Sequence, residues 1–198
     1  MRVIAGRLRG RRLLAPPGAN TRPITDRVKE TLFSILGTRF GTPGAIPETD
    51  VLDLFAGTGS LGIEALSRGA RSCLFVERDW RTISALRQNI SSLSLQPGSQ
   101  ILRANAWTVR LAPTPAYGLI FADPPYRDAA DPLRLAAFLE GLASHLTENG
   151  LIVLRRPAAS ELPSELLRLL VCVDDRRIGT MRLCLFARVG PEGPSPHA

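Results

Sequence analysis

Between residues 50 and 155 the chain alternates short apolar runs with amphipathic stretches of helical spacing, and this alternation constrains its fold most strongly. Strands are expected at 50–55, 72–77, 100–104, 117–122 and 150–155, and helices at 60–68, 80–92, 131–146 and 161–169. This order is typical of an α/β protein with a doubly wound, Rossmann-like, mainly parallel sheet. Two closing strands near 170–176 and 181–188 lie too close in sequence for a crossover helix, which predicts an antiparallel C-terminal hairpin.

The amino-terminal segment has a different pattern. Residues 2–14 alternate arginine with valine, isoleucine and leucine, interrupted by Gly6 and Gly10, which indicates a short hairpin or an extended arm. Thr25 can cap the following helix, and Gly37 can end it. One amphipathic helix therefore connects the arm to the main domain.

Length and composition favour a single domain. The 198 residues are 44% hydrophobic, enough for one well-packed core. We expect an arm and helix at 1–45, a main part at 46–189 and a disordered tail at 190–198. No apolar run approaches the roughly 20 residues that a membrane span needs. The start also lacks a signal-peptide core, so we expect a cytoplasmic protein with no membrane partner.

The net charge of +7 and the pI near 10.5 are consistent with a polyanionic partner. Residues 1–25 contain no acidic residue, and Lys29 is the only lysine of the chain. Because the planar guanidinium group suits phosphate, this segment predicts a nucleic-acid-binding arm, although a solvated hairpin edge would carry the same residues. The predicted RNA-binding residues are Arg2, Arg7, Arg9, Arg11, Arg12 and Arg22.

Cysteine and histidine are sparse and scattered. Cys73, Cys172 and Cys184 form no C-x-x-C pair, and His145 and His197 have no partner at ligand spacing. The sequence therefore predicts neither a structural disulfide nor a metal site.

The first strand of the main domain leads into a glycine turn. Residues 57–62 read G-x-G-x-x-G, and Glu77 follows Gly57 by twenty residues at the end of the next predicted strand. The same string would suit a dinucleotide. However, the carboxylate of Asp53 at the strand end would repel a pyrophosphate, whereas it could meet an ammonium group or order the glycine turn. We therefore favour S-adenosylmethionine over a dinucleotide.

The expected contacts follow from the shape of S-adenosylmethionine. Gly57 and Gly59 would let the backbone approach the methionine portion, and Glu77 would bind both ribose hydroxyls. Asn105 and Ala106 follow the third strand, where an acceptor for the adenine amine is expected, but Asn105 could equally cap a helix. The predicted cofactor-binding residues in the main domain are Asp53, Phe55, Ala56, Gly57, Thr58, Gly59, Glu77, Arg78, Asn105 and Ala106.

The tetrapeptide Asp123-Pro124-Pro125-Tyr126 follows an apolar strand and has a preset geometry, because proline fixes its own φ and restricts the residue before it. The Asp123 carboxylate and the Pro124 carbonyl can accept two hydrogen bonds, and Tyr126 can offer a ring face. A planar aromatic amine needs such acceptors to become nucleophilic. An ordinary turn is the alternative, which the upstream glycine turn disfavours.

Together these segments resemble the RsmD family of bacterial methyltransferases, which act on the N2 amine of a guanine in 16S ribosomal RNA. The resemblance extends to about Arg188, and its most specific part is residues 22–33, followed by 52–70 and the tetrapeptide at 123–126. It implies the class I methyltransferase fold, S-adenosylmethionine as cofactor, and a substrate within the small ribosomal subunit or its assembly intermediate. It also implies that Asp123 binds the guanine amine, Tyr126 stacks on the flipped base, and the segment near Thr25 closes over the cofactor.

Four positions depart from the usual pattern of this family. Ser34 stands where asparagine is common, Asn105 where aspartate is common, and Ile178 where tyrosine often precedes a glycine. Arg155, at the end of the fifth main-domain strand, stands where an acidic residue or histidine is more usual.

Two other functions fit the sequence. An N6-adenine DNA methyltransferase would present the same kind of conjugated amine to the tetrapeptide, although the chain has no extra target-recognition segment. A noncatalytic RNA-binding or assembly factor would keep the fold, but the intact Asp53, Glu77 and Asp123 argue against it. Nothing in the sequence demands more than a monomer.

Overall fold

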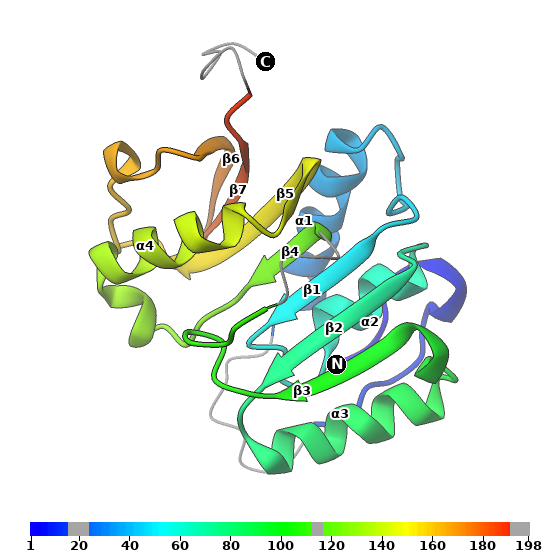
Figure 1. Ribbon diagram of the computed structural model, residues 1–198. Helices are drawn as coiled ribbons and strands as arrows, with labels where there is room; N and C mark the ends of the chain where they lie inside the picture. The colour runs from blue at the N-terminus through cyan, green and yellow to red at the C-terminus, as the bar shows by residue number, and fades with distance from the viewer. Residues whose placement is uncertain (16–23, 112–116, 191–198) are drawn as a thin grey trace. The chain divides into compact units, whose positions relative to one another are not determined.

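The computed structural model describes residues 1–15, 24–111 and 117–190. The chain divides into two compact units, Met1–Val109 and Arg110–Ala198. Each unit is built on its own set of neighbouring strands (Figure 1). The helices are α1 (Asp26–Arg39), α2 (Ser60–Ser67), α3 (Trp80–Ser92) and α4 (Pro132–Ala143). The strands are β1 (Asp50–Leu54), β2 (Ser72–Glu77), β3 (Ser99–Arg103), β4 (Tyr117–Ala122), β5 (Leu146–Pro157), β6 (Leu170–Ile178) and β7 (Met181–Arg188).

In the first unit, three parallel strands lie in the order β3-β2-β1. Val51 pairs with Cys73, and Cys73 pairs in turn with Ser99, so the carboxyl ends of the three strands lie at the same edge. Helices α2 and α3 pack against these strands. All positions of β1 after Asp50 are buried, as expected of a parallel strand that is covered by helices.

In the second unit, the strand order is β4-β5-β7-β6. Strand β4 pairs with β5 in parallel, whereas β7 is antiparallel to both β5 and β6. The predicted antiparallel C-terminal hairpin is therefore confirmed. Every residue of β4 is buried, and the buried Leu135 and Leu139 of α4 add to the apolar core of this unit.

Several expected boundaries are wrong. Gly37 does not end the first helix, which continues to Arg39. The predicted helix at 161–169 is absent, and only a short 3-10 turn forms at Ser164–Leu166. Leu166 and Leu169 are 42% and 53% exposed, so a helix there would bury no apolar face to stabilise it.

The amino-terminal arm is part of the folded first unit. Its hairpin character is limited to one antiparallel bridge between Arg2 and Arg12. Val3 and Leu13 are buried, and a Cβ atom at Gly6 would lie 1.9 Å from the carbonyl oxygen of Ser67 in α2. Only glycine allows so close a contact between the arm and α2.

Two other predictions stay open, one on the C-terminal tail and one on the number of domains. The disordered tail at 190–198 falls almost entirely outside the described residues. The single-domain organisation stays a prediction. No helix of the described part of the chain is long and apolar enough to cross a membrane.

Candidate active site

The turn between β1 and α2 has the strained backbone expected of a ligand-binding loop. Phe55, Gly57 and Gly59 have positive φ values of 60°, 57° and 83°. A Cβ atom at Gly59 would lie 2.5 Å from Leu86, so the loop also packs too closely for a larger residue. Non-glycine residues with positive φ are uncommon and cluster at functional sites, which directs attention to Phe55.

The Asp53 side chain holds this turn in place through a hydrogen bond to the backbone of α2. Its side chain is 2% exposed, and its Oδ2 accepts a hydrogen bond of 2.9 Å from the backbone N–H of Gly62 in the first turn of α2. Of the two roles considered for this carboxylate, the ordering of the glycine turn is the one with a contact in the structure. Contact with the ammonium group of a cofactor stays a prediction.

Glu77 lies at the carboxyl end of β2 and joins that strand to the turn. Its Oε2 accepts a hydrogen bond of 2.9 Å from the backbone N–H of Gly57, and its Oε1 accepts 2.8 and 2.9 Å bonds from the N–H groups of Arg78 and Asp79. The carboxylate is thus held by backbone groups and forms no ion pair with the exposed Arg78 or Arg81. A half-buried, oriented carboxylate next to a glycine turn fits the expected ribose hydroxyls.

Asn105 and Ala106 follow β3, at the same edge of the strands as Glu77. The Asn105 side-chain oxygen accepts a 3.1 Å hydrogen bond from the N–H of Trp107, so it caps a turn. The Trp107 ring meets that of Phe55 edge to face, with ring centres 5.2 Å apart. The sequence prediction missed Trp107, although its place directly after Asn105 and Ala106 could have indicated it.

Thr25 caps α1 as predicted, since its hydroxyl oxygen accepts a hydrogen bond of 3.4 Å from the N–H of Val28. The structure assigns this local role to the residue. Closure of the segment over a cofactor stays a prediction.

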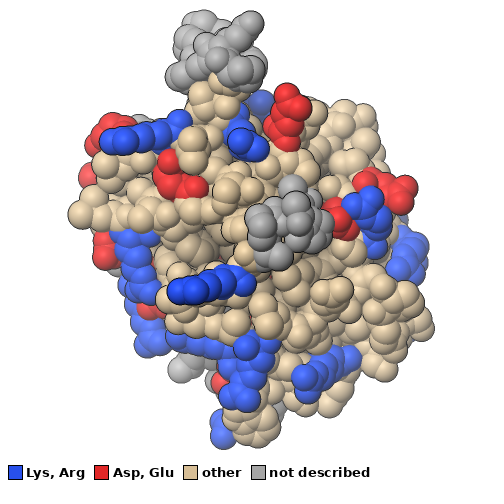
Figure 2. Space-filling view, in the orientation of Figure 1, with Lys and Arg blue, Asp and Glu red and all other residues tan. Residues whose placement is uncertain are grey.

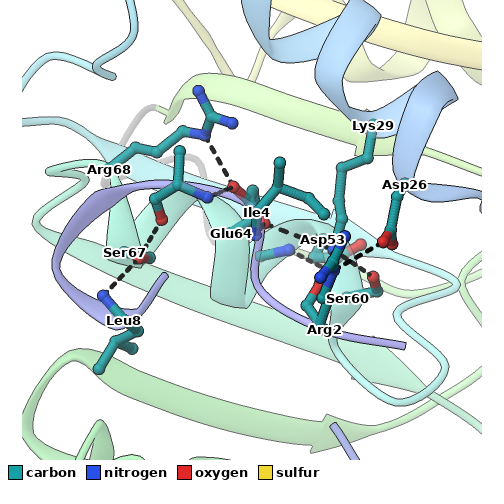
Figure 3. Close-up of polar contacts among 12 residues, drawn as sticks. Arg2, Ile4, Leu8, Asp26, Lys29, Asp53, Ser60, Glu64, Ser67 and Arg68 are labelled. Carbon is teal, nitrogen blue, oxygen red and sulfur yellow. Dashed lines mark hydrogen bonds and ion pairs between the residues drawn. The ribbon is translucent and has the colours of Figure 1, made fainter. Parts of the chain in front are cut away.

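A buried ion cluster joins the arm, α1 and α2, and sequence reasoning missed it (Figure 3). Glu64 is fully buried, and its carboxylate lies 3.4 Å from Lys29 Nζ and 2.8 Å from Arg68 Nε. The same carboxylate accepts hydrogen bonds of 2.8 and 2.9 Å from the N–H groups of Ile4 and Ala5. Burial lowers the pKa of Lys29, and Glu64 opposes part of that change.

This cluster also reaches the glycine turn between β1 and α2. Lys29 Nζ donates to the hydroxyl of Ser60, the first residue of α2, at 3.2 Å. From α3, the buried Asn89 donates to the carbonyl oxygen of Thr58 at 3.0 Å and bonds to both backbone groups of Leu14. The arm and the glycine turn therefore share anchoring side chains.

The arginines of the arm differ in their contacts. Arg2 pairs with Asp26 at 2.8 Å, and Arg11 donates to the carbonyl oxygen of Ser92 at 3.0 Å. Figure 2 shows both basic and acidic side chains exposed at the surface. Arg22 lies outside the described residues. The exposed arm arginines whose side chains make no hydrogen bond or ion pair to another described residue are Arg7, Arg9 and Arg12.

The second unit carries the tetrapeptide at the end of β4. Asp123 does not simply point outward, because its Oδ1 is 2.6 Å from Nε of Arg155 on β5, and the two side chains are only 17% and 11% exposed. Burial raises the pKa of the Asp123 carboxyl, and the Arg155 guanidinium counteracts part of this rise. Pro124 is buried, whereas Pro125 and Tyr126 are half-buried.

Within the described residues, no group of three or more histidine, cysteine, aspartate or glutamate side chains could hold a metal ion. Cys73, Cys172 and Cys184 are all free thiols.

Comparison with known proteins places these features in a family. The family model described as Conserved hypothetical protein 95 matches residues 1–187. Bacillus subtilis YlbH, whose own assignment as an rRNA methyltransferase is provisional, is 41% identical over 82% of this chain and 86% of its own length. Ribosomal RNA small subunit methyltransferase D of Escherichia coli K12 is 36% identical over 76% of this chain and 68% of its own length.

Solved structures agree with this placement. Escherichia coli yhhF, provisionally assigned as a methyltransferase, has a TM-score of 0.76 at 30% identity and covers 95% of this chain and 97% of its own. An S-adenosylmethionine-dependent methyltransferase from Clostridium acetobutylicum has a TM-score of 0.65 over 82% of this chain and 91% of its own, and at 11% identity it shows the fold alone. The predicted class I methyltransferase fold is confirmed. The chain therefore belongs to the Conserved hypothetical protein 95 family, the RsmD-like group of S-adenosylmethionine-dependent methyltransferases.

Proposed function

We propose that this protein transfers the methyl group of S-adenosylmethionine to the exocyclic N2 amine of a guanine in 16S ribosomal RNA. The observation that carries the proposal is the Asp123 carboxylate. Its Oδ1 is held by Arg155, while its Oδ2 makes no hydrogen bond to another described residue. A fixed, mostly buried carboxylate with one vacant oxygen suits an amine N–H.

The first unit offers the cofactor residues. The turn at Gly57 and Gly59, where both residues have positive φ, would accommodate the methionine portion, and the Glu77 carboxylate would accept hydrogen bonds from the ribose hydroxyls. Asp53 would act mainly by holding the turn in shape. S-adenosylmethionine supplies a methyl group on a positively charged sulfur, so the leaving group needs no acid.

The second unit offers the residues for the target base. Asp123 Oδ2 and the Pro124 carbonyl would accept the two amine hydrogens and draw the nitrogen out of the ring plane, which frees its lone pair. As positive charge develops on that nitrogen, a preoriented carboxylate stabilises it more than water would. The Tyr126 ring would stack on the extruded base, because enzymes that modify a base usually remove it from its stack.

The RNA partner is supported by the arm and by the relatives. The arm is anchored to the first unit and carries three exposed arginines, Arg7, Arg9 and Arg12. Their side chains can contact phosphates without first breaking a hydrogen bond or ion pair to another described residue. Relatives are named as small-subunit rRNA methyltransferases. We propose that the protein acts as a monomer on the small ribosomal subunit or its assembly intermediate.

Methyl transfer from labelled S-adenosylmethionine tests this function directly. The substrates are small ribosomal subunits from a strain that lacks the gene, free 16S RNA and duplex DNA, and the modified nucleotide is identified by mass spectrometry. We expect N2-methylguanine in RNA and no transfer to DNA. Methyladenine in the duplex would instead support the DNA enzyme, and binding to RNA without transfer to any substrate would support a noncatalytic factor.

Substitution of Asp123 tests the site. Removal of one preorganised group that stabilises developing charge typically costs about 10² to 10³ in turnover, so Asp123→Ala should lose that much while it still binds cofactor. Asp123→Asn should keep partial activity, since its amide oxygen still accepts. The matched control is Glu148→Ala, which removes an exposed carboxylate of the same unit. Wild-type turnover by Asp123→Ala would reduce the tetrapeptide to a structural turn.

A further inference from the structure

Arg155 is the charged residue in closest contact with the tetrapeptide, and the proposed reaction assigns it no step. It lies on β5, where Leu154 pairs with Ala122 of the parallel strand β4. This register brings the ends of the two strands together, so Arg155 Nε can donate to Asp123 Oδ1 at 2.6 Å. At 11% and 17% exposure, the pair is largely removed from solvent.

Because the pair is buried, the contact with Arg155 affects the pKa of the Asp123 carboxyl. Desolvation raises the pKa of its carboxyl, and Arg155 is the one charged residue found to act against that rise. An opposite charge within about 4–6 Å commonly lowers the pKa of a carboxyl by about 1 to 3 units. Without the guanidinium, the buried carboxyl would therefore be protonated more readily, and a protonated carboxyl is a poorer acceptor.

One buried polar atom of Arg155 and one of the tetrapeptide lack a hydrogen bond to another described residue. They are Arg155 Nη1 and the hydroxyl of Tyr126. A buried polar group without a partner costs about 1 to 3 kcal/mol, so such atoms are commonly explained by an absent ligand or water. Both atoms belong to residues of the same two strand ends, which is consistent with a site that receives a polar molecule.

We propose that Arg155 is a positioning residue that holds Asp123 ionised, turns its Oδ2 toward the amine and makes the acceptor site electrically neutral. The proposal rests on the proposed methyl-transfer function and gives an electrostatic reason for its substrate class. A lone buried carboxylate would favour a protonated alkylamine, whereas a carboxylate already paired with arginine suits a neutral, ring-conjugated amine. The site therefore selects nucleobase amines over lysine-type ammonium groups.

The test compares Arg155→Met, which removes the charge, with Arg155→Lys, which keeps it. Arg168→Met is the control, since Arg168 is an exposed arginine of the same unit. The Asp123 carboxyl is titrated by carbon-13 NMR of aspartate-labelled protein, with the signal assigned by its loss in Asp123→Asn. Methyl transfer to small ribosomal subunits is measured as a function of pH on the same proteins.

We expect Arg155→Met to raise the Asp123 titration midpoint, because the opposing charge is removed, and to move the acid limb of the rate profile upward by the same amount. Arg155→Lys should restore much of both, and Arg168→Met should match wild type. The proposal is overturned if Arg155→Met leaves both the titration midpoint and the acid limb unchanged. It is also overturned if the wild-type protein methylates a lysine peptide as fast as it methylates small ribosomal subunits. Thermal unfolding of each variant confirms that it is folded, and Arg155→Lys gives a second test if Arg155→Met is not.

The two proposals fail in different ways. If wild type methylates no nucleic acid while the midpoint shift is still present, the proposed function is refuted and the pairing of Arg155 with Asp123 stands. If wild type methylates guanine normally and the midpoint does not respond to Arg155, the positioning role is refuted and the function stands.

Discussion

Substitution of Glu64 by glutamine should destabilise the protein strongly, although glutamine has nearly the same shape. Glu64 is fully buried and forms ion pairs with two cations, Lys29 and Arg68, that are themselves only 1% and 6% exposed. Loss of one partner from a buried ion pair costs about 3 to 5 kcal/mol, because the remaining charge is left unpaired. Against a total stability of about 5 to 15 kcal/mol, this is a large loss.

The arm provides a local measure of the same change. The Glu64 carboxylate accepts hydrogen bonds from the N–H groups of Ile4 and Ala5, whereas a glutamine side chain has only one acceptor oxygen and adds a donor NH₂ group. At least one of these N–H groups should therefore lose its partner. We expect faster hydrogen exchange at Ile4 and Ala5 than in wild type.

The pH dependence should change with a defined sign. Burial lowers the pKa of Lys29 in the folded protein, so the unfolded chain binds this proton more readily and stability rises with pH between the lowered value and 10.5. Glu64 opposes this lowering of the Lys29 pKa. Because Glu64→Gln removes the carboxylate charge, the pH range over which stability rises should extend to lower pH.

Urea denaturation at equilibrium, repeated from neutral to alkaline pH, measures both effects. Glu30→Gln is the matched control, because Glu30 is an exposed carboxylate on α1. If Glu64→Gln costs no more free energy of unfolding than Glu30→Gln, the cluster does not stabilise the fold and the reasoning is refuted.

Three further predictions concern binding. Glu77→Ala should weaken S-adenosylmethionine binding in calorimetric titration by about 1.5 to 3 kcal/mol for each charge-assisted hydrogen bond lost; unchanged affinity would contradict the ribose role. Combined substitution of Arg7, Arg9 and Arg12 by glutamine should weaken RNA binding and flatten its log-log salt dependence by about 0.7 to 0.9 for each lost phosphate contact, and an unaltered slope would argue against these contacts. In single-turnover methylation, Tyr126→Phe should stay active and Tyr126→Ala should lose base stacking of about 1 to 3 kcal/mol, whereas equal rates would exclude stacking.

The arm shows where sequence and structure differ in what they can reveal. Its arginine-rich pattern predicted a hairpin or extended arm that binds nucleic acid, and deletion of residues 1–22 is the simplest test of that prediction. Because Val3 and Leu13 are buried and Gly6 packs against Ser67, such a deletion would also remove part of the core. Substitution of exposed side chains is therefore the sharper experiment.

Local pattern was sufficient for the elements that carry the site. Helix α3 and strands β2, β4 and β7 have the predicted bounds, because caps and apolar periodicity are written into short stretches of sequence. The helix expected at 161–169 does not form, because periodicity cannot say whether an apolar face will find a surface to bury against. That depends on the whole fold.

The sequence by itself determined the order of strands and helices from β1 to β5, the glycine turn after β1 and the rigid Asp-Pro-Pro step after β4, since each depends on the conformational limits of neighbouring residues. Only the tertiary structure decided that Arg155 pairs with Asp123, 32 positions away, and that Glu64 holds the arm. Residue type states which charge a side chain carries, but its partner is fixed by strand register and by which charges the fold encloses together. In a low-dielectric interior those enclosed charges must compensate one another.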